Sequence, residues 1–488
     1  MKVITLNNKV EFNIKDYISE AAFCPCDADE ETKEKFLRSI GASLYDSNAK
    51  VNANLVANHI LKHTNIIPLD NYNLAIYNGK YFEIKDAQII INYIIKKVLN
   101  CLGSRWNSKR EIEINEAIKR SFDYKILSLD TENVINLSNG VLSLDDFKLS
   151  KHSPNYYCSN VLNTKYDKNA DCPKWLAFLN QTFMGDQSLI DLLQEIFGMC
   201  ISNVNVGKCA IFYGSGMNGK SVVASVLKSL VGENCVSHLS LERFQSQFGL
   251  QSLIGKRLNI ASELETGDFN LLTANFKAIV TGDPVHVDIK YKDPLEMVLN
   301  CKLVFLTNNL PETLDSSHGF LRRLMILPFN HTVKEKDKDI HLSEKLKDEL
   351  SGILNWAIEG LKRLQKNNYI FTESQAAKEC LNAYKKQLND VGDFFDECYV
   401  KKQGAKFRKA ELYSFYNMYC HINGNPCIGR KEFWKKLKSF FANKKYVWDV
   451  RALNGVEYIY GYSKNSEIQF DIPSVGVATN NEFAIDFP

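Results

Sequence analysis

Apolar and polar positions follow strand-like and helical periods in distinct blocks along the 488-residue chain. Between residues 208 and 330, short apolar runs alternate with helical stretches, which is the pattern of a parallel sheet covered by helices. Three of these runs, at 209–213, 258–262 and 303–307, are apolar enough to be buried strands. We therefore predict an α/β domain with a parallel sheet in this part of the chain.

The remaining sequence divides into smaller regions. Helical periodicity is clear at 87–101 and 109–121, and two more helices are predicted within 174–200. A multidomain protein is expected from this pattern and from the length. The predicted regions are a mixed α/β domain of unclear role (1–125), a helical and strand region that is a candidate oligomerisation collar (126–200), the α/β core (201–365), a helical connector (366–391), a C-terminal module (392–464) and a polar tail (465–488) that is either disordered or an interaction strand.

The C-terminal module has a recognisable order of elements. Residues 392–464 follow the order helix, helix, helix, β-ribbon, and the ribbon turns at Asn454-Gly455, a sequence typical of tight hairpins. This order predicts a winged helix, in which one helix enters the major groove of DNA and the ribbon contacts the backbone.

Composition excludes several classes of protein. The start of the chain is too polar for a signal peptide and no apolar run approaches 18 residues, so we expect a protein that is neither exported nor membrane-spanning. The 13 cysteines are odd in number and scattered, which fits a reducing cytosol better than a disulfide framework. Cys24 and Cys26 form a C-P-C pair, but no second Cys/His pair follows at zinc-finger spacing, so buried thiols are favoured over a metal site.

Positive charge is concentrated near the C-terminus. The formal net charge of the whole chain is only +3, yet residues 401–464 contain 14 Lys and Arg against four Asp and Glu, a net charge of +10. A compact basic module on a mildly acidic body indicates contact with nucleic acid.

A phosphate-binding motif follows the first buried strand. The sequence Gly-Ser-Gly-Met-Asn-Gly-Lys-Ser begins at Gly214 and runs directly into a helical stretch. In such a P-loop the glycines permit a tight turn of amides around an anion, while Lys220 binds the β- and γ-phosphates and Ser221 coordinates Mg²⁺. The alternative, a glycine-rich turn, is disfavoured by the flanking strand and helix. The candidate residues for ATP are Gly214, Ser215, Gly216, Met217, Asn218, Gly219, Lys220, Ser221 and Val222.

Polar residues follow two later strands, where nucleotide hydrolysis needs them. Glu263 ends one strand, with Glu265 two residues on, and such an acid could organise Mg²⁺ or activate water. Asn308 ends another strand, and its amide can contact both the γ-phosphate and the attacking water. The alternatives are a surface acid for Glu263 and a turn-initiating Asn before Pro311.

Two further groups of residues complete the set. Arg322 and Arg323 precede an apolar strand, and a guanidinium there could complete a neighbouring subunit's site as an arginine finger, unless the pair is simply solvated. A predicted hairpin carries cations and an aromatic ring that could hold a DNA strand, although a solvated hairpin is as compatible with the pattern. Its candidate residues are His286, Lys290, Tyr291 and Lys292.

The joint order of these motifs is more specific than any one of them. P-loop, strand-terminal Glu, K-Y-K hairpin, T-N-N-L-P and R-R-L resemble the superfamily III helicases of the AAA+ ATPases, and within them the phage and plasmid primase-helicases. The resemblance covers roughly residues 60–465 and includes Asn218 of the loop. It implies that Glu263 is the leading Walker B acid, Asn308 is sensor 1, and Arg323, with Arg322 second, is the finger. It further implies a hexameric ring, 3′-to-5′ movement and a cytoplasmic protein encoded by a bacterial phage or mobile element.

The third helix of the module is the main candidate for duplex binding. On 429–445, an inward stripe (Phe433, Trp434, Leu437, Phe440, Phe441) leaves cations on the other side. The alternative is a solvated helix in a protein-binding domain. The candidate DNA contacts are Arg430, Lys431, Lys435, Lys436, Lys438, Lys444, Lys445 and Arg451.

The sequence thus predicts a replication initiator and DNA helicase that uses ATP and Mg²⁺, binds double-stranded origin DNA and single-stranded DNA, and self-associates. A host replication protein is a further expected partner. A primase-helicase is a second hypothesis, although 1–125 is too short for the primase domain of many relatives. A DNA-binding regulator or assembly factor with an ATPase switch is a hypothesis of another class.

Overall fold

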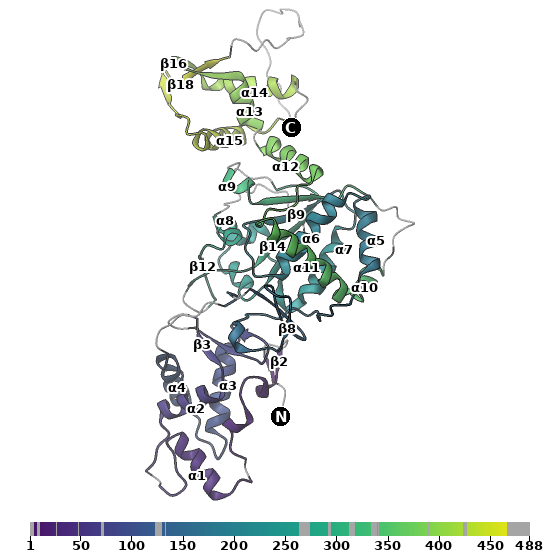
Figure 1. The fold of residues 1–488 in the computed structure, drawn as a ribbon. Helices are drawn as coiled ribbons and strands as arrows, with labels where there is room; N and C mark the ends of the chain where they lie inside the picture. Colours follow the sequence, from purple (N-terminus) through teal and green to yellow (C-terminus); the bar gives the residue numbers. More distant parts are fainter. Residues whose placement is uncertain are drawn as a thin grey trace, which may run out of the picture. The chain divides into compact units, whose positions relative to one another are not determined.

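A computed structural model of the protein shows two compact units (Figure 1). The first contains the described residues up to Tyr384, and the second contains those from Lys385 onward, so the boundary falls within helix α12 (Gln375–Leu388). The structure describes residues 4–6, 10–25, 27–46, 48–69, 73–122, 129–131, 133–262, 274–290, 294–311, 318–332, 339, 341–388, 390–422 and 427–465.

A five-stranded parallel sheet forms the centre of the first unit. Its strand order is β10-β11-β14-β9-β15, and every neighbouring pair is parallel. The sequence prediction of a parallel sheet in this block is therefore confirmed. The strands are β9 (Cys209–Tyr213), β10 (Val236–Ser237), β11 (Leu258–Ser262), β14 (Lys302–Thr307) and β15 (Leu324–Pro328).

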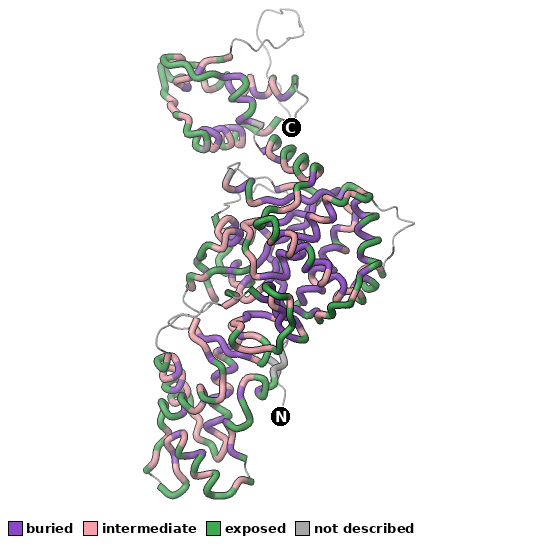
Figure 2. The backbone as a smooth tube through the Cα atoms, viewed as in Figure 1, coloured by how far each residue is buried: buried purple, intermediate pink, exposed green. Residues whose placement is uncertain are grey.

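Apolar helices cover one face of this sheet. Side chains from α5 (Pro173–Thr182), α6 (Gln187–Ile201), α7 (Lys220–Val231) and α11 (Leu350–Lys366) share one buried cluster with residues of all five strands. Buried residues are accordingly concentrated in the sheet and on these helices (Figure 2). Trp356 lies inside this cluster, edge-on to Trp175 at a centroid separation of 5.5 Å.

Helices α6 and α11 approach each other unusually closely because glycines lie at their contact. A Cβ on Gly360 would lie 2.3 Å from the Gln194 carbonyl oxygen, and one on Gly198 would lie 2.7 Å from the Leu361 nitrogen. Side chains larger than hydrogen are excluded at both positions. This close approach stiffens the layer that supports the sheet.

Shorter elements surround the core of the first unit. A hairpin of β12 (Val285–Val287) and β13 (Leu295–Met297) follows α8 (Ala274–Thr281). The segment before α5 forms a three-stranded antiparallel sheet of order β6-β7-β8. The remaining elements here are β6 (Val134–Leu137), β7 (Gly140–Ser143), β8 (Leu149–Ser150), α9 (His318–Leu321) and α10 (Leu342–Lys347).

The N-terminal region has its own core of helices and small sheets. Both helices predicted there are present as α3 (Ala87–Leu99) and α4 (Ser108–Arg120). Isoleucines of α3 and α4 pack with Val56 and Ile60 of α2 in one buried cluster. The other elements are β1 (Ile4–Leu6), β2 (Val10–Phe12), α1 (Glu30–Ser39), α2 (Ala53–His63), β3 (Ile66–Pro68), β4 (Leu74–Tyr77) and β5 (Phe82–Glu83).

In its described residues the second unit contains, after the end of α12, three helices and a three-stranded antiparallel sheet of order β16-β18-β17. Strand β16 begins at Tyr399 and was not predicted, because the sequence prediction placed only helices before the ribbon. Aromatic side chains from all three helices and from the sheet form its core. The elements are α13 (Asp390–Cys398), β16 (Tyr399–Arg408), α14 (Lys409–Ile422), α15 (Arg430–Asn443), β17 (Val450–Leu453) and β18 (Val456–Lys464).

The sequence also led to predictions about membrane spans and about the C-terminal tail. None of the described helices has the length and apolar character needed to cross a membrane. The polar tail predicted for 465–488 lies outside the described residues beyond Asn465.

Candidate nucleotide site and nucleic-acid surfaces

The P-loop connects the C-terminal end of β9 to the start of α7. Its first residue is anchored to the neighbouring strand, because the Gly214 amide donates to the Thr307 carbonyl of β14 at 3.2 Å. Gly219 precedes α7 with a φ of 87°, in the left-handed region that favours glycine. A Cβ on Gly214 would lie 2.4 Å from the Phe329 carbonyl oxygen, so only glycine fits there. The turn therefore depends on its glycines, as the sequence predicted.

Asn218 fastens the loop to the strand on the other side of β9. Its side chain is buried, and Nδ2 donates to the Phe329 carbonyl oxygen at 2.9 Å, just beyond the end of β15. The loop is thus held between β14 and β15. The sequence marked Asn218 as characteristic of the motif but could not show this acceptor, which is 111 residues away.

Lys220 and Asn308 meet at the end of the sheet. The buried Lys220 ammonium donates to Asn308 Oδ1 at 3.1 Å and to the Gly214 carbonyl oxygen. Asn308 directly follows β14, and it is exposed, so it remains accessible to a ligand at the loop. Burial lowers the pKa of Lys220 from its ordinary value. A nearby phosphate would favour the charged ammonium, since opposite charge raises the pKa of a lysine.

The expected Mg²⁺ ligands are only partly within the described residues. Ser221 is exposed in the first turn of α7, where its hydroxyl can serve as an oxygen ligand. β11 ends at Ser262, beside Leu306 of β14, and Glu263 and Glu265 directly follow it in sequence but lie outside the described residues. Across the described ranges, no group of three or more His, Cys, Asp or Glu side chains could hold a metal ion.

Arg322 and Arg323 lie at the opposite edge of the sheet from the P-loop. Cys209 at the start of β9 donates its amide to the Arg323 carbonyl at 2.8 Å, whereas Gly214 follows the far end of the same strand. The length of β9 separates them by roughly 16 Å. Neither arginine is therefore placed near the P-loop of its own chain.

The two arginines differ in their surroundings. Arg323 is half-buried, its Nη1 donates to the Gly319 carbonyl, and its Nε is buried without an acceptor among the described residues. Arg322 is exposed, and its backbone carbonyl accepts from Lys208 Nζ at 2.6 Å. The geometry therefore favours Arg322 as the residue that can extend toward another molecule, whereas the family resemblance implies Arg323.

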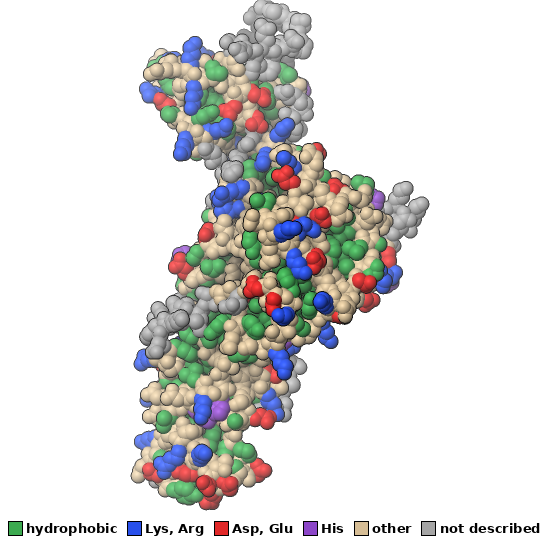
Figure 3. All heavy atoms as spheres, in the orientation of Figure 1, with side chains coloured by type: hydrophobic (Ala, Val, Ile, Leu, Met, Phe, Trp, Pro, Cys, Tyr) green, Lys and Arg blue, Asp and Glu red, His purple; other side chains and the backbone are tan. Residues whose placement is uncertain are grey.

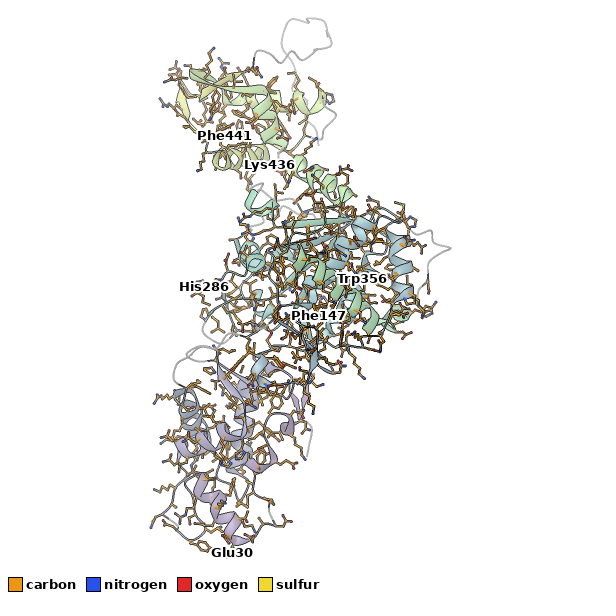
Figure 4. The ribbon with its side chains drawn as sticks, in the orientation of Figure 1. Glu30, Phe147, His286, Trp356, Lys436 and Phe441 are labelled. Atoms are coloured by element: carbon orange, nitrogen blue, oxygen red, sulfur yellow. The ribbon has the colours of Figure 1, made fainter. Side chains whose placement is uncertain are left out.

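The predicted DNA hairpin is present as β12 and β13. Val285 and Val287 of β12 are buried, while His286 is exposed opposite Glu296 and points away from the core (Figure 4). Lys290 is exposed beyond β12, and its amide donates to Gln251 Oε1 at 3.3 Å. Tyr291 and Lys292 lie outside the described residues.

Helix α15 presents cations on its outer side. Phe433, Leu437, Phe440 and Phe441 of the predicted stripe are buried, and Trp434 is only half-buried. Lys and Arg side chains are prominent on the face of the second unit in Figure 3. Of the candidate contacts, Lys436 is half-buried and the exposed ones are Arg430, Lys431, Lys435, Lys438, Lys444, Lys445 and Arg451.

Two of these cations already have carboxylate partners. Lys444 Nζ lies 3.0 Å from Asp396 Oδ2, and Arg451 makes a two-bond ion pair with Asp449 at 2.7 and 2.9 Å. These contacts raise the pKa of both Lys444 and Arg451. The exposed cations of α15 itself are thus the more available charges for DNA.

One long-range contact near the site was not foreseen from the sequence. The buried Tyr384 hydroxyl of α12 donates to the Pro311 carbonyl at 2.5 Å, three residues after Asn308. It ties the segment that carries Asn308 to the helix that leads into the second unit. No local motif marks this tyrosine, because the partner is 73 residues away.

Known protein families match successive parts of this chain. A family described as D5 N terminal like matches residues 53–184, and one described as Poxvirus D5 protein-like matches residues 386–472, which include the described second unit from α13 onward. A family of unknown function, DUF5906, matches residues 212–323, which contain the P-loop, Asn308 and both arginines.

Individual relatives agree with these matches. Putative helicase L207/L206 of Acanthamoeba polyphaga mimivirus is 23% identical over 360 residues, covering 66% of this chain and 36% of the relative. Replication protein E1 of Cottontail rabbit papillomavirus is 27% identical over 114 residues, covering 23% of this chain and 18% of the relative.

These matches support a superfamily III helicase/primase-helicase family for this chain. The predicted family resemblance is thereby confirmed, and the relatives named as a putative helicase and a replication protein support a replication helicase-like function. The chain matches about a third of the length of the mimivirus relative. It is also similar to the apo structure of the NrS-1 C-terminal region, with a TM-score of 0.46 and 12% identity, covering 84% of this chain and 100% of that chain.

Proposed function

We propose that the protein is an ATP-dependent DNA helicase and replication initiator that unwinds origin DNA as a ring, with a hexamer as the expected form. The observation that carries the proposal is the hydrogen bond between Lys220 and Asn308 at the C-terminal edge of the sheet. A phosphate-binding lysine and a strand-terminal amide at that separation can contact the same γ-phosphate. Family membership supports the choice of DNA as the object of the motor.

The residues of the P-loop have different roles in the proposed binding of ATP. The amides of 214–221 and the start of α7 would surround the phosphates, and the Lys220 ammonium would exchange its Gly214 carbonyl partner for phosphate oxygens. Asn308 would then lie close enough to hold the attacking water by its amide. The acid that accepts the proton from this water is proposed to be Glu263, with Glu265 as the second candidate.

Magnesium fits the donor set at this edge. Ser221, next to the phosphate-binding lysine, supplies a hydroxyl oxygen, and Glu263 is proposed as the second ligand. When bound, the ion would neutralise charge that develops on the β- and γ-phosphates.

Self-association is proposed because neither candidate arginine is placed to act as a finger from within its own chain. Both candidate arginines are roughly a strand's length, ~16 Å, from the loop. An exposed Arg322 on one subunit could approach the P-loop of the next, with Arg323 anchored to helix α9 through the Gly319 carbonyl. Hydrolysis would then require two subunits.

The second unit is proposed to bind the origin duplex as a winged helix. Its order α13-β16-α14-α15-β17-β18 and its antiparallel sheet fit that fold. In this reading α15 enters the major groove and the Asn454-Gly455 turn lies near the backbone. The hairpin bearing His286, Lys290, Tyr291 and Lys292 is proposed to hold one strand after opening.

Strand displacement from a forked DNA duplex tests the helicase proposal. Wild-type protein with ATP and Mg²⁺ should release the strand, and Lys220→Ala should not, while its binding to duplex without nucleotide stays largely unchanged. Hydrolysis without strand release, under conditions where rings are present, would instead favour the ATPase-switch regulator. Primer synthesis from ribonucleotides on a single-stranded template would favour the primase-helicase.

A further inference from the structure

We infer that the outer face of the β16-β18-β17 sheet binds single-stranded DNA, with Tyr458 and Tyr460 as stacking platforms. This surface is distinct from the basic side of α15, and its use requires neither ATP nor unwinding. The inference therefore stands apart from the proposed motor function.

The register of the sheet defines the face. Phe407 of β16, Ile459 of β18 and Val450 of β17 lie side by side and contribute to the core of the unit. Because successive side chains alternate between faces, their neighbours in sequence lie on the opposite, outer face. Tyr458 is one of these neighbours, and it is paired with Arg408 on one side and Arg451 on the other.

Cations lie over both tyrosine rings. Lys406 Nζ lies 4.9 Å from the centre of the Tyr458 ring and 5.9 Å from that of Tyr460, and Arg451 Cζ lies 5.0 Å from the Tyr460 ring. Tyr458 and Tyr460 are half-buried, while Lys406, Arg408 and Arg451 are exposed. Cation–π contacts with the two rings thus keep these side-chain cations at defined positions on the surface.

The charge of this face is complementary to a phosphate backbone. On this face β16 supplies Lys406 and Arg408, and β17 supplies Arg451. The nearby acids are exposed or half-buried, with Asp449 paired to Arg451 and Glu411 lying 3.9 Å from Arg408. Surface pairs of this kind contribute little and can be exchanged for phosphate contacts.

Aromatic rings on the surface of a sheet select unpaired DNA. In a duplex the bases are stacked on one another, so their faces are not available to a tyrosine. An unpaired strand offers base faces for stacking and phosphates for the surrounding cations, without regard to sequence.

Photocrosslinking of the full-length protein, without nucleotide, tests this inference. The probe is an oligothymidine strand containing one 5-iododeoxyuridine, and adducts are located by mass spectrometry. We expect adducts on Tyr458 or Tyr460 that excess unlabelled oligothymidine removes and the same excess of blunt duplex leaves in place. Adducts absent from 456–464, or removed equally by duplex, would overturn the assignment.

Paired variants separate stacking from structure. Replacing both tyrosines by Ser should weaken oligothymidine binding by roughly tenfold or more, whereas replacing both by Phe should preserve most of it. Tyr45→Ser, at a tyrosine that is 68% exposed in the N-terminal region, is the matched control and should have no effect. Equal affinity of the Ser and Phe double variants would contradict the inference. Blunt-duplex binding should be the same in all of these proteins, and its loss in the Ser double variant alone would count against a single-strand surface.

Discussion

The Lys220 ammonium donates a hydrogen bond to Asn308 Oδ1 at 3.1 Å and thereby joins the P-loop to the end of the neighbouring strand. The sheet order explains this contact, because β14 lies directly beside β9 and both strands end at the same edge. A ligand that attracts the lysine must also affect the asparagine. Binding of phosphate and positioning of the attacking water are thus expected to be coupled in this site.

Asn308→Ala should lower the rate of ATP hydrolysis much more than the affinity for ATP. The amide is expected to act on the transition state, and loss of such a donor costs about 10²–10³ in kcat. Measuring kcat and the nucleotide Kd separately makes this distinction. Asn309→Ala is the control, because the backbone contacts of Asn309 with Thr307 survive that change. An Asn308→Ala protein with normal kcat would remove the residue from the mechanism.

Arg322→Ala should abolish most ATP hydrolysis, and mixing with subunits that retain Arg322 should restore part of it. Fingers of this type contribute about 10³ or more to kcat, so the variant alone should be nearly inactive. Mixed with Lys220→Ala subunits, it should recover part of the activity at interfaces that combine an intact loop with an intact arginine. We expect Arg323→Ala to lower the melting temperature instead, because its guanidinium holds the Gly319 carbonyl. Mixed rings that remain inactive would count against a finger supplied by Arg322.

Tyr384→Phe should loosen the segment that carries Asn308. The change removes the hydrogen bond to Pro311 and should cost about 1 kcal/mol in free energy of unfolding. A several-fold lower kcat should accompany this loss, since residues 307–311 then lose their tie to α12. Tyr369→Phe, at a tyrosine that is 44% exposed, serves as the control in both urea unfolding and hydrolysis assays. If Tyr384→Phe changes neither the free energy of unfolding nor kcat, the hydrogen bond between Tyr384 and Pro311 is unimportant for the site.

Lys302→Met should stabilise the protein, and the gain should shrink in alkaline solution. Burial, and secondarily the charge of Arg257, lowers the pKa of Lys302 from 10.5 to about 8; Asp130, Cys200 and Cys301 oppose this shift. Between these values the unfolded chain binds more protons than the folded one, so the wild type gains stability as the pH rises from 8 toward 10.5. The free energy of unfolding of Lys302→Met should therefore exceed that of the wild type by about 1–3 kcal/mol at pH 7, and by progressively less above pH 8.

Urea unfolding at several pH values measures this effect. The exposed Lys168→Met should stay within about 0.5 kcal/mol of the wild type at every pH. A stability difference between Lys302→Met and wild type that is constant from pH 7 to 10 would contradict the assigned pKa.

Local patterns in the sequence were sufficient to predict the strands of the parallel sheet and the P-loop. A buried strand such as β9 is a continuous apolar run, and the glycines of the loop are required by the backbone itself. Strand β16 was missed because KKQGAKFR is polar on both faces, and its register with β18 is interrupted between Lys401 and Lys406. An exposed edge strand of this kind has no clear period of two.

The contacts that position the site residues could not be predicted in the same way. The partner of Asn218 is a backbone carbonyl on a distant strand, and that of Tyr384 is a carbonyl in the Asn308 segment. Backbone carbonyls carry no sequence signature. The difference between Arg322 and Arg323 likewise depends on a contact with the Gly319 carbonyl of α9, which a pair of adjacent arginines does not reveal.

The most direct test of the account is the rate of forked-duplex unwinding when wild-type subunits are mixed with increasing fractions of Lys220→Ala subunits at constant total protein. If ATP bound at Lys220 drives strand separation through sites shared between subunits, the rate should fall more steeply than the wild-type fraction. Unwinding that declines in proportion to that fraction would contradict a cooperating ring. Unwinding that persists with Lys220→Ala alone would contradict the proposed motor itself.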